Sequence, residues 1–159
     1  MLQPLDVIVL RGNLYNPMTY VIMQRTSSRW THAVTYKGSG QVYDARMSGV
    51  CISKLDHYKG RRCAVLRYAN EIPRQKSIAM LMWLDKLAKA SKPYDYAALA
   101  GFLTGFKAFE NENSWYCSEI PYWMYQEFDM PLFNGEKTFI YPSDLYRCND
   151  FKIVYEGKV

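Results

Sequence analysis

The chain has 159 residues, of which 49% are hydrophobic and 16% aromatic, and its formal net charge is +5. This apolar content excludes a disordered chain and can fill one core, so we expect a single domain over residues 1–159. The Lys and Arg residues are scattered and their densest group, residues 58–62, is short. The charge therefore predicts a basic surface and no nucleic-acid partner.

The sequence shows neither a membrane span nor an export signal. No apolar run reaches the roughly 18 residues that a spanning helix needs. The start, MLQPLDVIVLRG, does not resemble a signal peptide, because its apolar run is only about five residues long and follows Asp6. We therefore expect a cytoplasmic location in the producing cell, with action at the cell envelope left open. The four cysteines are widely spaced without a CxxC motif, which favours free thiols.

Local signals predict the first two elements. Residues 6–12, DVIVLRG, are rich in Val and Ile, which predicts a short buried strand. Residues 16–25, NPMTYVIMQR, predict a helix, because Asn16 is a good N-cap and Pro17 occupies the first helical position. A strand followed directly by a helix is thus expected at the start of the chain.

A β-hairpin is expected next. Residues 31–36, THAVTY, and residues 41–45, QVYDA, alternate between apolar and polar side chains, as half-buried strands do. The intervening KGSG supplies the glycines that a tight turn needs. The segments GVCIS (49–53) and RCAVLRY (62–68) continue the pattern as two further strands.

The period then becomes helical. Residues 73–92 predict a helix of several turns whose apolar side is Ile78, Leu81, Met82, Leu84 and Leu87. Residues 94–105, YDYAALAGFLTG, predict a buried helix capped by Asp95 and stopped by Gly105. These two segments are the first helices after the strands.

A third helix is expected over residues 115–128. Pro121 must lie in its first turn, where the missing N–H costs nothing, so the helix should begin near Cys117. Residues 139–148 predict a strand end with a short helical turn, and residues 150–157 a final strand. Strands clustered early and helices later indicate an α+β domain, with an antiparallel β-sheet packed against helices.

The two hairpin strands carry a histidine and an aspartate. If the hairpin turns at Gly38, then His32 and Asp44 face each other, with Cβ atoms roughly 4.5–5.5 Å apart. The carboxylate can then accept a hydrogen bond from one ring nitrogen of His32, which fixes the tautomer and leaves the other nitrogen available. This is a base together with the residue that orients it.

Cys117 is the candidate nucleophile. Its expected position at a helix start favours the thiolate, because free N–H groups and the helix dipole stabilise an anion there. The same N–H groups can stabilise an oxyanion at the attacked carbon. A cysteine at a helix start that faces a strand histidine is the arrangement of papain-like enzymes. In papain the cysteine precedes the histidine, whereas here His32 comes first.

This inverted order resembles the circularly permuted NlpC-type papain-like cysteine hydrolases, in their YiiX-like branch, which is related to lecithin retinol acyltransferase-like enzymes. The matching stretches, in chain order, are PLDVIVLRG, THAVTY, GQVYDA, SGVCISKLDHY, KPYDY, WYCSE and YPSDLYRC. The resemblance implies a permuted papain-like fold with Cys117 as nucleophile, His32 as base and Asp44 as orienting residue. The family usually has Gly-Asp where this chain has Leu5-Asp6, and often Glu where it has Asp44.

The resemblance implies a cysteine hydrolase that forms an acyl-enzyme intermediate on amide bonds, with peptidoglycan peptides as one candidate substrate. An acyltransferase or a lipid (thio)esterase of the same fold is the first alternative. A non-catalytic binding module is the second. No metal or organic cofactor is implied, and the sequence does not indicate an oligomeric state.

Two smaller hypotheses concern other residues. Three aromatic side chains next to the candidate site either line a substrate groove or belong to the core, namely Trp30, Trp115 and Tyr116. Three further residues could supply zinc ligands, but their even six-residue spacing lacks the close pair of most structural zinc sites; they are Cys51, His57 and Cys63.

Overall fold

The computed structural model describes residues 1–12, 17–46, 49–90, 117–133 and 139–159. Within them, six strands form one antiparallel sheet in the order β4-β3-β2-β1-β5-β6. The strands are β1 (Val7–Arg11), β2 (Trp30–Gly38), β3 (Gln41–Arg46), β4 (Gly49–Lys54), β5 (Arg62–Tyr68) and β6 (Phe151–Lys158). The helices are α1 (Pro17–Thr26), α2 (Arg74–Lys89), α4 (Glu119–Glu127), α5 (Pro142–Arg147) and the 3₁₀ turn η1 (Leu55–Tyr58). This α+β architecture confirms the expected fold class.

The expected strands are present except the strand end expected within residues 139–148, where only the helix α5 forms; the helices expected over 16–25, 73–92 and 115–128 are also present. Pro17 is the first residue of α1, as its fixed φ favours. The helix expected over 94–105, with Asp95 and Gly105, lies outside the described residues, as does the N-cap Asn16. None of the helices that the structure describes is both long enough and apolar enough to cross a bilayer.

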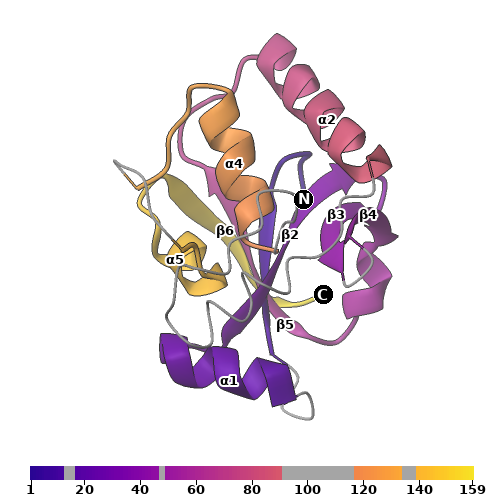
Figure 1. Ribbon diagram of the computed structural model, residues 1–159. Coiled ribbons are helices and arrows are strands. Elements are labelled where there is room, and N and C mark those ends of the chain that lie inside the picture. Colours follow the sequence, from indigo (N-terminus) through magenta and orange to yellow (C-terminus); the bar gives the residue numbers. More distant parts are fainter. Residues whose placement is uncertain (13–16, 47–48, 91–116, 134–138) are drawn as a thin grey trace.

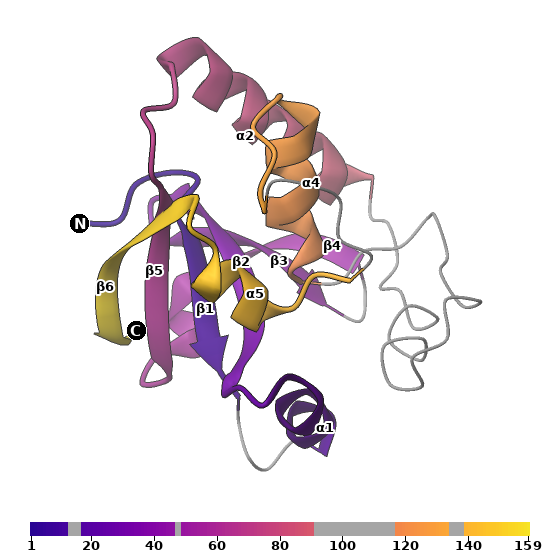
Figure 2. The same ribbon diagram turned by 90° about the vertical axis from the view of Figure 1, so that its left-hand side faces the viewer.

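The sheet separates two hydrophobic clusters. Side chains of alternate strand residues point to opposite faces, so Val7 and Val9 join one cluster while Ile8 and Leu10 join the other. The larger cluster also contains buried residues of α2, α4 and α5, which lie on one side of the sheet (Figure 2). The smaller cluster is closed by Tyr58 of η1. α1 lies at the end of the sheet away from α2 (Figure 1).

The expected apolar side of α2 is partly wrong. Ile78 and Met82 are 48% and 58% exposed, whereas Met80, Leu84 and Leu87 are buried against the sheet. The buried residues follow the spacing i, i+4, i+7 and form one stripe. The helix carries apolar residues on more than one side, so its sequence does not by itself say which stripe meets the sheet.

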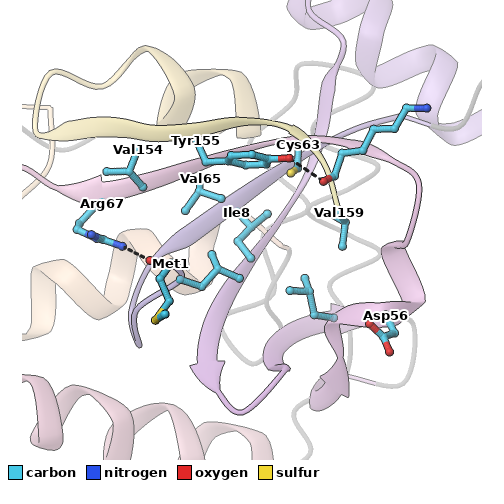
Figure 3. A pocket seen from close by; sticks show the side chains of 12 residues that line it. Met1, Ile8, Asp56, Cys63, Val65, Arg67, Val154, Tyr155 and Val159 are labelled. Carbon is cyan, nitrogen blue, oxygen red and sulfur yellow. Dashed lines mark hydrogen bonds between the residues drawn. The ribbon is translucent and has the colours of Figure 1, made fainter.

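The smaller cluster borders a cavity of about 570 Å³ (Figure 3). Its wall includes Ile8, Cys63 and Val65 of the sheet, and Tyr155 donates a hydrogen bond of 3.0 Å to the Lys158 carbonyl at its rim. The described residues that line it include none of the three candidate catalytic side chains.

The β2–β3 turn contains three successive residues with positive φ, the first of which is Gly38 (φ 122°). Gly38 pairs with Gln41, so Ser39 (φ 50°) and Gly40 (φ 71°) form a two-residue loop. Two positive φ values in such a loop are typical of a type I′ turn, whose twist matches that of the flanking strands.

Replacing Gly40 with Ala should lower the free energy of unfolding by about 1 kcal/mol, because an L-residue with a side chain is strained at this φ. A Cβ at Gly40 would meet no atom within 4 Å, so the loss would come from the backbone alone. Ser39→Asn is the matched control and should keep or slightly raise stability, since Asn tolerates positive φ. Urea unfolding measures both. Equal stability of wild type and Gly40→Ala would mean that the turn has another conformation.

Candidate active site

His32 on β2 and Asp44 on β3 are in direct contact. The His32 Nε2 atom lies 2.9 Å from Asp44 Oδ1. The Asp44 side chain has no exposed surface, and that of His32 is 19% exposed. An ionised carboxylate has no proton to give, so Nε2 carries the proton and donates it. This fixes the tautomer and leaves Nδ1 as the other nitrogen of the ring.

The register expected for this pair is wrong, although the contact is present. Thr35 pairs with Tyr43 and Tyr36 with Val42, so the same register would place Val34 opposite Asp44. The reason is twofold: the turn is centred on Ser39–Gly40 rather than on Gly38, and the register shifts by one residue between Tyr36 and Gly38. A shift of two residues keeps every side chain on its face, and diagonal neighbours in a sheet remain within reach of long side chains.

A bulge adjoins His32. The register of β1 against β2 shifts between Leu10, which pairs with His32, and Arg11, which pairs with Trp30. Trp30 and Ala33 both join the larger cluster, although strict alternation would place them on opposite faces. Bulges re-aim side chains in this way and are frequent beside active sites.

Asp44 accepts hydrogen bonds from more residues than the hairpin pattern predicts. Its Oδ2 atom accepts from Tyr58 Oη at 2.6 Å, from Arg46 Nε at 2.7 Å and from Ser53 Oγ at 3.3 Å. Of these, Arg46 could have been found, because it lies two residues after Asp44 on the same face of β3. Ser53 and Tyr58 reach the carboxylate only through the β3–β4 register and the position of η1.

These contacts keep Asp44 ionised. Burial alone would raise the pKa of its carboxyl group. The hydrogen bond and charge of His32, together with the hydrogen bonds from Tyr58 and Arg46, outweigh burial and hold that pKa well below its ordinary value. For Tyr58, burial and the neighbouring Asp44 charge raise the pKa, so its phenol remains protonated.

Cys117 lies at the start of α4, as expected from Pro121. It immediately precedes the N-cap residue Ser118, and Pro121 is the third residue of the helix. Ser118 is completely buried, and its Oγ donates to the Ile140 carbonyl at 2.5 Å. This bond connects the beginning of α4 to the segment before α5. The Ser118 hydroxyl does not cap the helix.

The side chain of Cys117 lies near enough to His32 to affect the pKa of the imidazole. Burial lowers the pKa of His32, but the negative charge of Cys117 and the hydrogen bonds to Asp44 and Cys117 raise it more, to about 10. Nε2 is already directed at Asp44, so Nδ1 is the ring nitrogen left for the thiol. The structure thus places the imidazole between a buried carboxylate and a thiol at a helix start.

Of the three aromatic residues considered for substrate binding, only Trp30 is described. Trp30 is 6% exposed, and the centroid of its ring lies 4.9 Å from that of Tyr146. The guanidinium of Arg11 lies over the face of the same ring. This is a place in the core, and a role in substrate binding stays a prediction. Trp115 and Tyr116 lie outside the described residues.

The zinc hypothesis does not agree with the fold. Cys51 is on β4 and Cys63 on β5, and three strands separate them. At ~4.8 Å per strand, that is roughly 19 Å along the sheet. His57 is exposed on η1, and its Nδ1 accepts a hydrogen bond of 3.0 Å from Arg46. All four cysteines are free thiols.

Comparison with known proteins identifies a similar fold. The crystal structure of the metalloprotein yiiX from Escherichia coli O157:H7, DUF1105, superimposes with a TM-score of 0.71, covering 99% of this chain and 98% of that one. The two sequences are 15% identical, so the likeness concerns the fold. No family model matches the chain, and neither does any curated protein.

Replacing Asp44 with Asn should cost about 3 kcal/mol of unfolding free energy at pH 7, because buried donors lose their charged acceptor. The folded-state pKa of Asp44 is lowered, so its contribution is complete above the unfolded value of about 3.9 and is lost as the pH falls through the lower folded value. The difference between wild type and variant should therefore narrow below pH ~4.

Urea unfolding between pH 3 and pH 7 measures this narrowing. Asp56→Asn, on an exposed residue of η1, is the control and should leave stability nearly unchanged throughout. A constant difference between wild type and Asp44→Asn would show that Asp44 is not the group whose pKa is lowered.

Proposed function

We propose that this protein is a cysteine hydrolase that cleaves amide bonds through an acyl-enzyme intermediate on Cys117. His32 is the base, and Asp44 orients it. The observation that carries the proposal is the position of His32, whose Nε2 bonds the buried Asp44 and whose pKa is raised by the nearby Cys117. A nucleophile, a base and an orienting carboxylate in this order are the parts of a catalytic triad.

The proposed reaction has two steps. His32 holds the proton of Cys117, and the thiolate sulfur attacks the amide carbonyl carbon, forming the C–S bond. His32 then gives its proton to the leaving amine as the C–N bond breaks. In the second step, His32 takes a proton from water, and the resulting hydroxide attacks the thioester. The C–S bond breaks, the carboxylic acid leaves, and the Cys117 thiolate with the protonated His32 is restored.

The start of α4 supports the developing negative charge. N–H groups in the first turn of a helix point away from the helix body and favour an anion. The Ser118 hydroxyl donates to the Ile140 carbonyl and makes no capping hydrogen bond with these N–H groups. They are the proposed donors to the oxyanion.

Peptide amides of the peptidoglycan are the substrates to examine first, because the motifs of this chain resemble cell-wall peptidases. The acyl-enzyme is common to hydrolysis and acyl transfer, which differ only in whether water or another nucleophile releases the acyl group. Product analysis with water alone, and with an added amine or alcohol, distinguishes the two.

A resident metal ion does not fit the described part of this chain, although yiiX, whose fold is similar, is described as a metalloprotein. No group of three or more His, Cys, Asp or Glu side chains converges there as metal ligands. Asp44 already uses one oxygen for His32 and the other for three donors. The proposed mechanism therefore routes no step through a metal.

Iodoacetamide should alkylate Cys117 faster than the other cysteines at pH ~6, because the paired imidazolium favours its thiolate. Burial raises the pKa of Cys51, Cys63 and Cys148, the last to about 11, which keeps these thiols protonated at this pH. Mass mapping of modified peptides gives the four rates. Equal rates at Cys117 and the partly exposed Cys51 would contradict the proposal and support a non-catalytic binding module.

Replacing His32 with Ala should lower hydrolysis of a susceptible peptide amide by at least ~10²-fold, the effect expected for loss of a general base. Asp44→Ala should lower the rate less, since it removes orientation and charge stabilisation but not the base. Asp44→Glu should keep more activity than Asp44→Ala. Thermal melts control for folding. A fully active Asp44→Ala variant would mean that another residue orients His32.

A further inference from the structure

We propose that Tyr58 is a positioning residue of this site, whose hydroxyl oxygen accepts a hydrogen bond from His32 Nε2–H, holds the imidazole in place against Asp44 and stabilises the ring when it becomes charged. The proposal rests on the proposed function. Tyr58 has no place in the triad expected from the sequence, and it comes from η1, outside the hairpin that carries His32 and Asp44.

The direction of each hydrogen bond follows from the number of protons. A phenol has one O–H, and Tyr58 gives it to Asp44 Oδ2 at 2.6 Å. The 3.1 Å contact between Tyr58 Oη and His32 Nε2 must therefore use the proton of the ring nitrogen. That proton is shared between Asp44 Oδ1 at 2.9 Å and the phenol oxygen. Three side chains thus form a closed ring of hydrogen bonds.

Tyr58 does not act as a base in this arrangement. Burial and the charge of Asp44 raise its pKa, so the phenol stays neutral. A neutral phenol that donates to Asp44 and accepts from His32 resists rotation of both partners. It also places a lone pair near the imidazolium that forms when Cys117 loses its proton to His32.

Packing fixes the phenol in this position. Tyr58 is 8% exposed and belongs to the smaller hydrophobic cluster, with Leu10 and Val34 of the neighbouring strands. The backbone N–H of Leu55 donates to the Gly40 carbonyl at 2.8 Å, which ties the first residue of η1 to the β2–β3 turn. The hydroxyl therefore reaches His32 because of the fold, and needs no movement of the side chain.

A second tyrosine–aspartate pair, between β3 and α2, provides a matched control. Tyr43 is completely buried and donates to Asp85 Oδ1 at 2.8 Å, but its partners are Lys37, Asp85 and the Leu81 carbonyl rather than a histidine. Removing either phenol hydroxyl deletes one phenol–carboxylate hydrogen bond. Only removal of the Tyr58 hydroxyl also takes an acceptor from the imidazole.

The test compares the rate of Cys117 alkylation by iodoacetamide at pH ~6 and at pH ~10 in wild type, Tyr58→Phe and Tyr43→Phe. The rate at pH ~6 depends on the thiolate–imidazolium pair, whereas the rate at pH ~10 reflects access to a thiolate. Tyr58→Phe should lower the pH 6 to pH 10 rate ratio by about three- to tenfold, as loss of one hydrogen bond of ordinary strength implies. Tyr43→Phe should leave the ratio unchanged.

Each outcome separates the alternatives. An unchanged ratio in Tyr58→Phe, or an equal change of both rates, would overturn the positioning role and leave Tyr58 as a structural residue. Equal rates at Cys117 and Cys51 in wild type at pH ~6 would instead overturn the proposed function itself.

If Tyr58→Phe does not fold, 3-fluorotyrosine at this position keeps the side-chain volume and weakens the oxygen as an acceptor. The ratio should then fall in the same direction, and an unchanged ratio would again overturn the role.

Discussion

A buried carboxylate must recover the hydration that it loses, and Asp44 does so through donors from four different elements. Taking an ion out of water costs several kcal/mol even after the protein relaxes. Asp44 offsets this cost with His32 of β2, Arg46 of β3, Ser53 of β4 and Tyr58 of η1. The Asp44 carboxylate therefore connects the three strands β2, β3 and β4. Its hydrogen bond with Nε2 also fixes the orientation of the His32 ring.

Two other carboxylates are held differently, which shows what is particular about Asp44. Asp6 is 1% exposed, and its two oxygens accept from Arg67 at 2.8 Å each. Asp85 is paired with Lys37 and Tyr43 at the junction of α2 and the sheet. Neither contacts an imidazole. Asp6 connects the chain before β1 with β5, and Asp85 connects α2 with β2 and β3. Asp44 differs from both because it also orients a histidine.

Backbone irregularities lie beside His32 and before β1. The bulge in β1–β2 beside His32 interrupts strict alternation, and the start of α4 sets the position of Cys117. Leu5 adopts a positive φ of 73°, at the position where the family that this chain resembles usually has glycine. Its side chain is 4% exposed in the larger cluster, so burial compensates for backbone strain. Deviations from regular structure thus concentrate around the strand ends and helix starts of this fold.

The sequence by itself determined what depends on neighbours in the chain: the strands, the helix starts at Pro17 and near Cys117, and the shared face of His32 and Asp44. His32 and Asp44 share a face even though the expected register was wrong, because a shift of two residues does not change the face to which a strand residue points. Only the tertiary structure decided the bulge, the buried stripe of α2 and the convergence of Ser53 and Tyr58 on Asp44. These depend on packing between segments distant in the chain, and one chain's pattern contains no local signal for such contacts.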